Sequence, residues 1–127
     1  MNTEIIVALI LVVILTTAIL FTIFLLNPSV TVLGVSMYPT YRDGELIYGT
    51  RLFRRDNIRV GDVVVLRHPY DSKYYLIKRV AHVYGSGKNK RIWVLGDNLE
   101  NSRDSRDFGT VSVKLVIAKI RNPRKLR

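Results

Sequence analysis

The sequence contains a run of 22 residues without a charge, "IIVALILVVILTTAILFTIFLL", from Ile5 to Leu26. About 20 apolar residues in a helix cross the hydrocarbon core of a bilayer. A cleavable signal peptide usually has a shorter apolar core of about 7–15 residues, a basic start and small residues before the cut. This run is longer and lacks both of the other features. We therefore predict an uncleaved transmembrane helix over residues 5–26, preceded by a short tail of residues 1–4.

Two features inside and after the run fit a membrane helix. Thr16, Thr17 and Thr22 are compatible with it, because threonine hydroxyls can bond to the helix's own carbonyl groups. Asn27 and Pro28 then provide a stop signal. Residues 27–127 are predicted to form one separate domain.

Charge is distributed unevenly between these two parts. The chain has a net charge of +10, yet residues 1–27 contain no Lys or Arg and only one acid, Glu4. A basic domain behind an apolar helix suggests anionic lipid headgroups as neighbours. We find no aromatic and basic motif of the RNA-binding kind, so nucleic acid is not an expected partner. The charge pattern does not decide which side of the membrane the domain occupies.

Six short runs of β-forming residues follow, separated by turn signals, and no long helical period is present. The predicted strands cover residues 30–35, 44–50, 61–68, 74–84, 91–97 and 111–120. Six strands in about 100 residues favour a mostly β domain, a small antiparallel barrel or sandwich. The basic tail after residue 120, "RNPRKLR", is expected to be solvated or to touch lipid headgroups.

One predicted strand carries a lysine on its apolar face. Side chains alternate between faces along a strand, so Leu76, Lys78 and Val80 share a face. A buried lysine is costly without a partner, and burial lowers its pKa. From the strand alone, Lys78 reaching outward to solvent is the commoner arrangement.

Residues 96–109, "GDNLENSRDSRDFG", form a polar segment between two apolar strands. Solvation alone would explain most polar loops. This one combines two serines, four acids and two arginines, and an ion pair between Asp104 and Arg106 would hold it rigid. A rigid polar loop is a plausible support for a catalytic site.

Taken together, these segments resemble the signal peptidase I family of membrane-bound serine proteases over nearly the whole chain. Four of them, in this order behind an apolar helix, are similar to the family's conserved boxes: "GVSMYPT" (34–40), "VGDVVVL" (60–66), "LIKRV" (76–80) and "GDNLENSRDSRDFGTV" (96–111). The resemblance implies a β-rich peptidase domain and an endopeptidase that removes N-terminal signal peptides from exported or sorted preproteins. Lysine at position 78 and the short spacing to Gly96 resemble the minimal bacterial and mitochondrial inner-membrane type. The implied location is a single-pass membrane protein with its catalytic domain on the extracytoplasmic side.

The resemblance implies that Ser36 is the nucleophile and Lys78 the general base. A serine hydroxyl needs an adjacent base, and a lysine serves only when its pKa falls well below its usual value of about 10.4. The Ser36 backbone N–H is implied as an oxyanion donor. In some members a hydroxyl two residues before the nucleophile is the second donor, and here that position is Gly34. The second donor therefore stays unassigned.

The remaining site residues are also implied by the resemblance. Ser102 would orient the Lys78 amine, Asp104 and Arg106 would brace the loop, and Gly96 and Asp97 would shape the turn beside the dyad. The substrate would bind as an extended strand, with small pockets that favour Ala-like side chains. The implied substrate-binding residues are Gly34, Val35, Met37 and Ile77.

No cofactor or metal is expected for this chemistry. The chain has no cysteine, and its histidines, His68 and His82, are a weak metal pair. Whether a partner subunit is needed stays open.

Three alternatives remain. One is another Ser-Lys protease related to self-cleaving repressors, against which the apolar helix argues. Another is a peptidase dedicated to one precursor, such as nickel superoxide dismutase, suggested by "VVLRHP". The third is a non-catalytic membrane-tethered β-domain that binds lipid or peptide.

Overall fold

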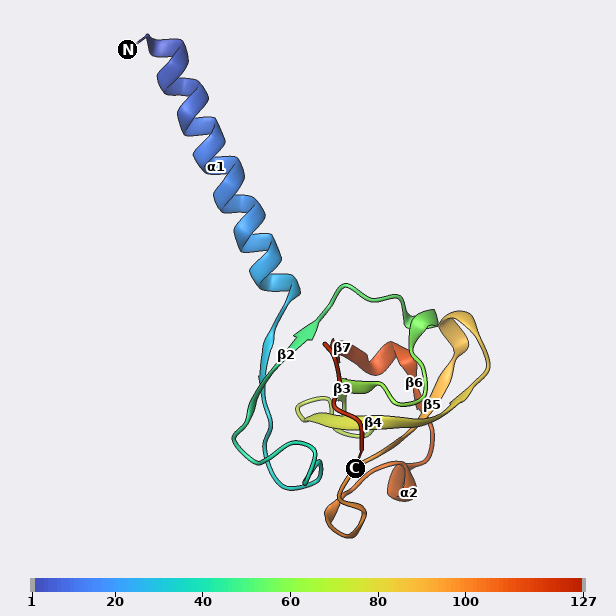
Figure 1. The fold of residues 1–127 in the computed structure, drawn as a ribbon. Helices are drawn as coiled ribbons and strands as arrows, with labels where there is room; N and C mark the ends of the chain where they lie inside the picture. The colour runs from blue at the N-terminus through green and yellow to red at the C-terminus, as the bar shows by residue number, and fades with distance from the viewer. Residues whose placement is uncertain (1, 127) are drawn as a thin grey trace.

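The computed structural model describes residues 2–126 and consists of one long helix followed by a β-rich domain (Figure 1). Helix α1 (Thr3–Leu26) has 24 residues, about 36 Å at 1.5 Å per residue, enough to cross a bilayer. It is the one helix among the described residues that is long and apolar enough to do so, and none of its residues is buried against the domain. The predicted segment 5–26 lies within it.

Threonines inside α1 bond to their own helix, as the sequence predicts. Thr17 Oγ1 donates to Val13 O at 2.9 Å, and Thr22 Oγ1 donates to Ala18 O at 2.8 Å. At the end of the helix, the Asn27 side chain donates to Ile23 O at 2.8 Å. Polar groups that an apolar environment could not satisfy are thus satisfied internally.

Within residues 2–126, seven antiparallel strands form the sheet of the domain, in the order β1-β2-β7-β3-β4-β5-β6. The prediction of a mostly β fold is confirmed. The strands are β1 (Ser29–Thr31), β2 (Leu46–Thr50), β3 (Val63–Arg67), β4 (Tyr75–Tyr84), β5 (Arg91–Leu95), β6 (Val111–Ser112) and β7 (Val116–Ile120). A four-residue helix, α2 (Ser105–Phe108), lies in the polar segment after β5. Short 3-10 turns lie at Arg55–Asn57, Gly87–Asn89, Leu99–Asn101 and Val113–Leu115.

The strand predicted over residues 111–120 is in fact two strands. A 3-10 turn at Val113–Leu115 separates β6 from β7, and the Ser112 side chain accepts a hydrogen bond from Lys114 N at its start. The break allows β6 to pair with β5 and β7 to pair with β2 and β3. Apolar periodicity continues across the turn, because Val113 and Val116 are both buried. The sequence pattern therefore did not reveal the break.

Strand β3 is the centre of the core because both of its faces are covered. Val64 and Leu66 belong to one core cluster, and Val63 and Val65 belong to a second one. The first core cluster contains Ile58, Val64, Leu66, Val80, Ile92, Val94, Val111, Val113 and Val116. The second core cluster contains Val32, Met37, Tyr41, Ile47, Val63, Val65, Ala118 and Ile120. A run of four apolar residues is what a strand buried on both faces requires.

The described residues of the C-terminal tail are mostly exposed, as expected for a solvated tail, but Arg124 ties the tail to the domain. Arg124 N donates to the Tyr41 hydroxyl at 2.9 Å, and the Arg124 side chain pairs with Glu45 at 2.5 Å. Its guanidinium also donates to Thr40 O at 2.9 Å. The tail therefore rests on residues 40–45, which follow the predicted nucleophile segment.

Candidate active site

Ser36 lies in a turn that is fixed on both sides. Before it, Gly34 has a positive φ of 82°, a conformation that favours glycine, and its N–H donates to Asp43 Oδ1 at 2.8 Å. After it, the Met37 side chain is fully buried in the second core cluster. Ser36 itself is only half-buried. Its hydroxyl is thus held in place while it remains accessible.

Lys78 lies on β4 and is 3% exposed. It is the register partner of Val64 on β3, so its side chain shares a face with a residue of the first core cluster. Its Nζ forms a hydrogen bond of 2.8 Å with Ser36 Oγ. Residues 42 positions apart in the sequence therefore meet at the site where the resemblance predicts a nucleophile and its base.

Burial lowers the pKa of Lys78, because the charged amine loses its hydration. The carboxylates of Asp104 and Asp97 act in the opposite direction and raise it, and burial prevails. The protein's own strands supply this burial. The nucleophile segment lies at the end of the domain away from α1, so a bilayer is not needed for it (Figure 1).

Asp104 and Arg106 form the ion pair that the polar segment predicts. Arg106 donates from Nε to Asp104 Oδ1 at 2.9 Å and from Nη2 to Oδ2 at 3.0 Å. Asp104 is fully buried and also accepts hydrogen bonds from Gly96 N at 3.0 Å and from Arg106 N at 3.2 Å. Burial raises the pKa of Asp104, but the hydrogen bonds from Arg106 and Gly96 outweigh it and lower the pKa to about 2. The carboxylate therefore stays charged and fixes both the start of α2 and the end of β5.

Gly96 is enclosed between two predicted site residues. A Cβ at this position would overlap the Ser102 hydroxyl and lie 2.6 Å from the Ser36 carbonyl oxygen. Only a residue without a side chain lets the polar segment approach the Ser36 backbone this closely.

The hydrogen bond that we expected from Ser102 to Lys78 is not formed in this structure. Ser102 Oγ is buried beside Gly96 and has no hydrogen-bond partner among residues 2–126. The role of Ser102 as the residue that orients the amine stays a prediction.

Sequence reasoning missed two sets of contacts beside the site. Arg79, the residue after Lys78, forms a bidentate ion pair with Asp97, with both N–O distances 2.8 Å. Asn98 donates from N to Ser36 O at 2.9 Å and from Nδ2 to Val35 O at 3.1 Å. The sequence gives no usable signal for these contacts. Arg79 follows the unusual lysine and Asn98 follows Gly-Asp, but both residue types are common in solvated loops.

The residues predicted to bind substrate differ in accessibility. Val35 is 51% exposed, and Ile77 is half-buried against the second core cluster. The Gly34 N–H is already bound to Asp43. The Met37 side chain is fully buried in the second core cluster, where it anchors the Ser36 turn, and a role of Met37 in substrate binding stays a prediction.

The structure contains no group of three or more His, Cys, Asp or Glu side chains arranged for a metal ion between residues 2 and 126. His68 follows the end of β3, and its Nδ1 accepts a hydrogen bond from Tyr70 N at 3.2 Å.

The chemistry that the site offers comes from Ser36 and Lys78. The half-buried Ser36 hydroxyl is hydrogen-bonded to the buried Lys78 amine, and nucleophilic catalysis by a serine requires a base in this position. The Ser36 N–H donates to no other residue of the described chain.

Comparison with known proteins gives an independent result. The model of the family described as "Signal peptidase, peptidase S26" matches residues 3–87 and 88–123. Mitochondrial inner membrane protease subunit 1 of Schizosaccharomyces pombe is 36% identical over 104 residues, covering 68% of this chain and 66% of that protein. Subunit 1 of Mus musculus is 31% identical, covering 68% and 63%. Subunit 2 of S. pombe is 32% identical over 113 residues, covering 71% and 60%. The chain thus spans less than two thirds of the length of these relatives.

Proposed function

The chain belongs to the signal peptidase family S26, and on that premise we propose that it is a membrane-bound serine endopeptidase that removes N-terminal signal peptides from exported or sorted preproteins. The observation that carries this proposal is the 2.8 Å hydrogen bond between Ser36 Oγ and Lys78 Nζ, with the amine 3% exposed. A lysine in this setting is available as a neutral base.

In the proposed reaction, Ser36 Oγ attacks the carbonyl carbon of the scissile peptide bond while its proton passes to Lys78 Nζ. The Ser36 N–H stabilises the resulting oxyanion, a contribution typically worth about 10²–10³ in rate. Lys78 then gives the proton to the departing amine, which breaks the C–N bond and leaves an acyl-enzyme. The neutral amine next takes a proton from water, whose oxygen attacks the carbonyl carbon of the ester. Lys78 then passes this proton to Ser36 Oγ as the ester C–O bond breaks, which releases the acid product and restores the hydroxyl and the neutral amine.

The surrounding residues hold the Ser36 turn in position relative to Lys78. Asn98 holds the backbone of Val35 and Ser36. Asp104 fixes the N–H of Gly96, a position where an added Cβ would lie 2.6 Å from the Ser36 carbonyl oxygen. We assign these residues to positioning, because none of their side chains contacts the Ser36 hydroxyl or the Lys78 amine.

The membrane setting is part of the proposal. The relatives are named as mitochondrial inner membrane proteases, which supports placing α1 in a membrane of that kind. That the membrane is a mitochondrial inner membrane or a bacterial cell membrane, with the domain on the extracytoplasmic side, follows from the family resemblance and is part of the proposal. They are also named as subunits 1 and 2, which supports a requirement for a second subunit.

The test is incubation of the full chain in detergent with a secretory preprotein, followed by N-terminal sequencing of the product. Cleavage after a small residue is expected for the wild type, and none for Ser36→Ala or Lys78→Met. Ser29→Ala, which changes a serine in β1 away from the dyad, is the matched control and should retain activity. Cleavage by Ser36→Ala would refute the proposed nucleophile. If the wild type is inactive, the assay is repeated with a relative's second subunit added.

A further inference from the structure

A cleft of about 670 Å³ opens beside the end of α1 that enters the domain. One wall is the loop after β2, with Leu52 and Arg54, and the other is the end of β7, with Lys119 and Arg121. We call it the loop cleft. Neither Ser36 nor Lys78 borders it, so it lies outside the site described above.

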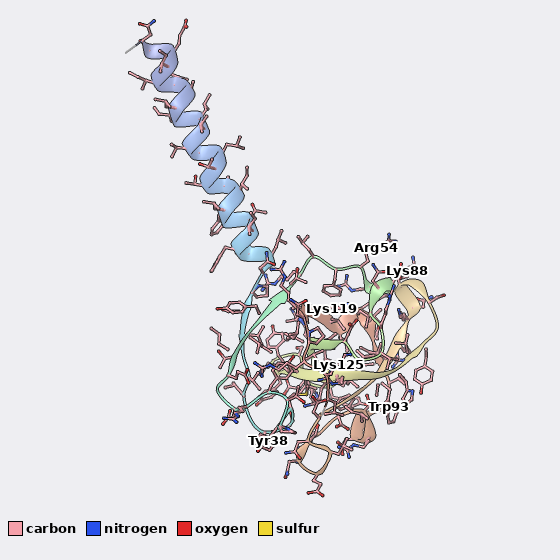
Figure 2. All side chains as sticks on the ribbon, in the orientation of Figure 1. Tyr38, Arg54, Lys88, Trp93, Lys119 and Lys125 are labelled. Atoms are coloured by element: carbon pink, nitrogen blue, oxygen red, sulfur yellow. The ribbon has the colours of Figure 1, made fainter. Side chains whose placement is uncertain are left out.

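The position of the loop cleft relative to the membrane is fixed by hydrogen bonds to the chain that leaves α1. Arg51 N donates to Leu26 O, the last residue of the helix, at 2.7 Å, and Gly49 N donates to Pro28 O at 2.9 Å. Figure 1 shows the segment after β2 passing beside the end of α1, and Figure 2 shows Arg54 at this end of the domain and Tyr38 at the other. With α1 across a bilayer, Arg51 therefore lies at the headgroup level.

The cations at the loop cleft are largely without acidic partners. Among residues 2–126, no acidic side chain pairs with Arg121, which borders the cleft, or with Arg51 and Arg55, which lie near it in the loop sequence but do not line it. Arg54 is 80% exposed and has only a 3.7 Å contact with Asp56. Lys119 is the exception, because it pairs with Asp62 at 2.8 Å. Unpaired guanidinium groups bind phosphate oxygens in bidentate geometry.

The loop combines these charges with an apolar residue and a fixed backbone. Leu52 is 67% exposed between Arg51 and the other arginines. The buried Lys90 amine donates to Asp56 O at 2.8 Å and to Ile58 O at 2.7 Å, which holds the far end of the loop on the domain. An exposed leucine flanked by cations suits the boundary between headgroups and acyl chains.

We propose that the loop cleft binds the phosphate of an anionic phospholipid at the membrane surface, with Arg54 and Arg121 contacting the phosphate and Leu52 entering the acyl region. The exposed leucine and the position at the helix end favour a lipid over free phosphate. The proposal depends on α1 as a membrane helix and not on the peptidase activity.

The experiment is a lipid titration of the full chain in an uncharged detergent, followed by native mass spectrometry. Phosphatidylglycerol, phosphatidylcholine and inorganic phosphate are the probes. Wild type is expected to bind phosphatidylglycerol at least tenfold more tightly than phosphatidylcholine. At about a fivefold loss per cation near a membrane surface, Arg54→Gln/Arg121→Gln should weaken phosphatidylglycerol binding by about 25-fold.

Arg67→Gln/Lys73→Gln is the matched control, because it removes two exposed cations from the β3–β4 end and should leave binding within about twofold. Leu52→Asp is a second variant, expected to weaken lipid binding while every cation is kept. Equal binding of both lipids, equal losses in the test and control variants, or unchanged binding in the test variant would overturn the proposal. If inorganic phosphate binds as tightly as phosphatidylglycerol, the ligand of the cleft is a free anion, and the proposal of a lipid is wrong.

Discussion

Gly96→Ala is the substitution whose effect follows most directly from the geometry of the site. Gly96 follows β5 without a left-handed backbone, so alanine tests space and not conformational strain. The added Cβ would overlap the Ser102 hydroxyl, lie 2.5 Å from Ser102 Cβ and lie 2.6 Å from the Ser36 carbonyl oxygen. The carbonyl oxygen is backbone and cannot rotate away. The Ser36 turn therefore has to move.

The distance that the Ser36 turn has to move determines the expected loss of activity. Ordinary contacts begin at 3.4 Å, so the Ser36 carbonyl must retreat by about 0.8 Å in a close-packed environment. A displacement of about 1 Å at a catalytic group costs on the order of 10² in rate. Overpacking also costs about 1–3 kcal/mol of stability. We expect kcat to fall about 100-fold, with a smaller change in KM.

The assay is steady-state cleavage of a preprotein by the full chain in detergent, with thermal unfolding measured on the same samples. Gly49→Ala is the matched control: its Cβ would lie 3.3 Å from Lys119 O, in β2, away from the dyad. Its kcat should stay within about threefold of wild type. A Gly96→Ala variant with the kcat of the control would refute the argument that this contact positions Ser36.

Three further predictions concern charge. Burial lowers the pKa of Lys78, and only the neutral amine accepts a proton, so kcat/KM should fall about tenfold per pH unit below that pKa; a flat pH–rate profile would contradict this. The pKa of Asp104 is lowered from 3.8 to about 2, so its charge stabilises the fold above pH 3.8 and this contribution is lost as pH falls through about 2. After discounting for solvent screening, Asp104→Asn should lower the free energy of unfolding by about 1–2 kcal/mol near neutral pH, measured by urea unfolding. Arg124→Ala should lower Tm because it breaks the contacts with Glu45 and Thr40, whereas Lys125→Ala should not; equal Tm values for both variants would argue against a packed tail.

Much of the fold could be predicted because strands are recognisable in a sequence, either from alternating apolar and polar residues or from short apolar runs. The apolar run Val63–Leu66 lies in the strand predicted over residues 61–68, and the structure shows that it is buried on both faces. Lys78 could be singled out because its position breaks an apolar face. The pair of Asp104 and Arg106 was predictable because opposite charges two residues apart meet in one short turn.

The remaining contacts join segments far apart in the sequence, and no local pattern encodes them. Arg124 contacts Tyr41, 83 residues away, and Lys90 reaches Ile58, 32 residues away. The burial of Met37 follows from how the Ser36 turn meets the sheet, which periodicity does not describe. Ser102 Oγ has no hydrogen-bond partner within the described part of the chain, and this depends on the exact placement of side chains, which the sequence does not predict.

The most direct test of the proposed mechanism is the pKa of the Lys78 amine in the folded protein. Lysine labelled with ¹³C at Cε would be titrated by NMR in the detergent-solubilised chain, with the Lys78 resonance assigned from its loss in Lys78→Met. We predict that this amine deprotonates at a clearly lower pH than the exposed lysines, because burial removes its hydration. An amine that titrates together with the exposed lysines, near about 10.4, would contradict the proposed general base.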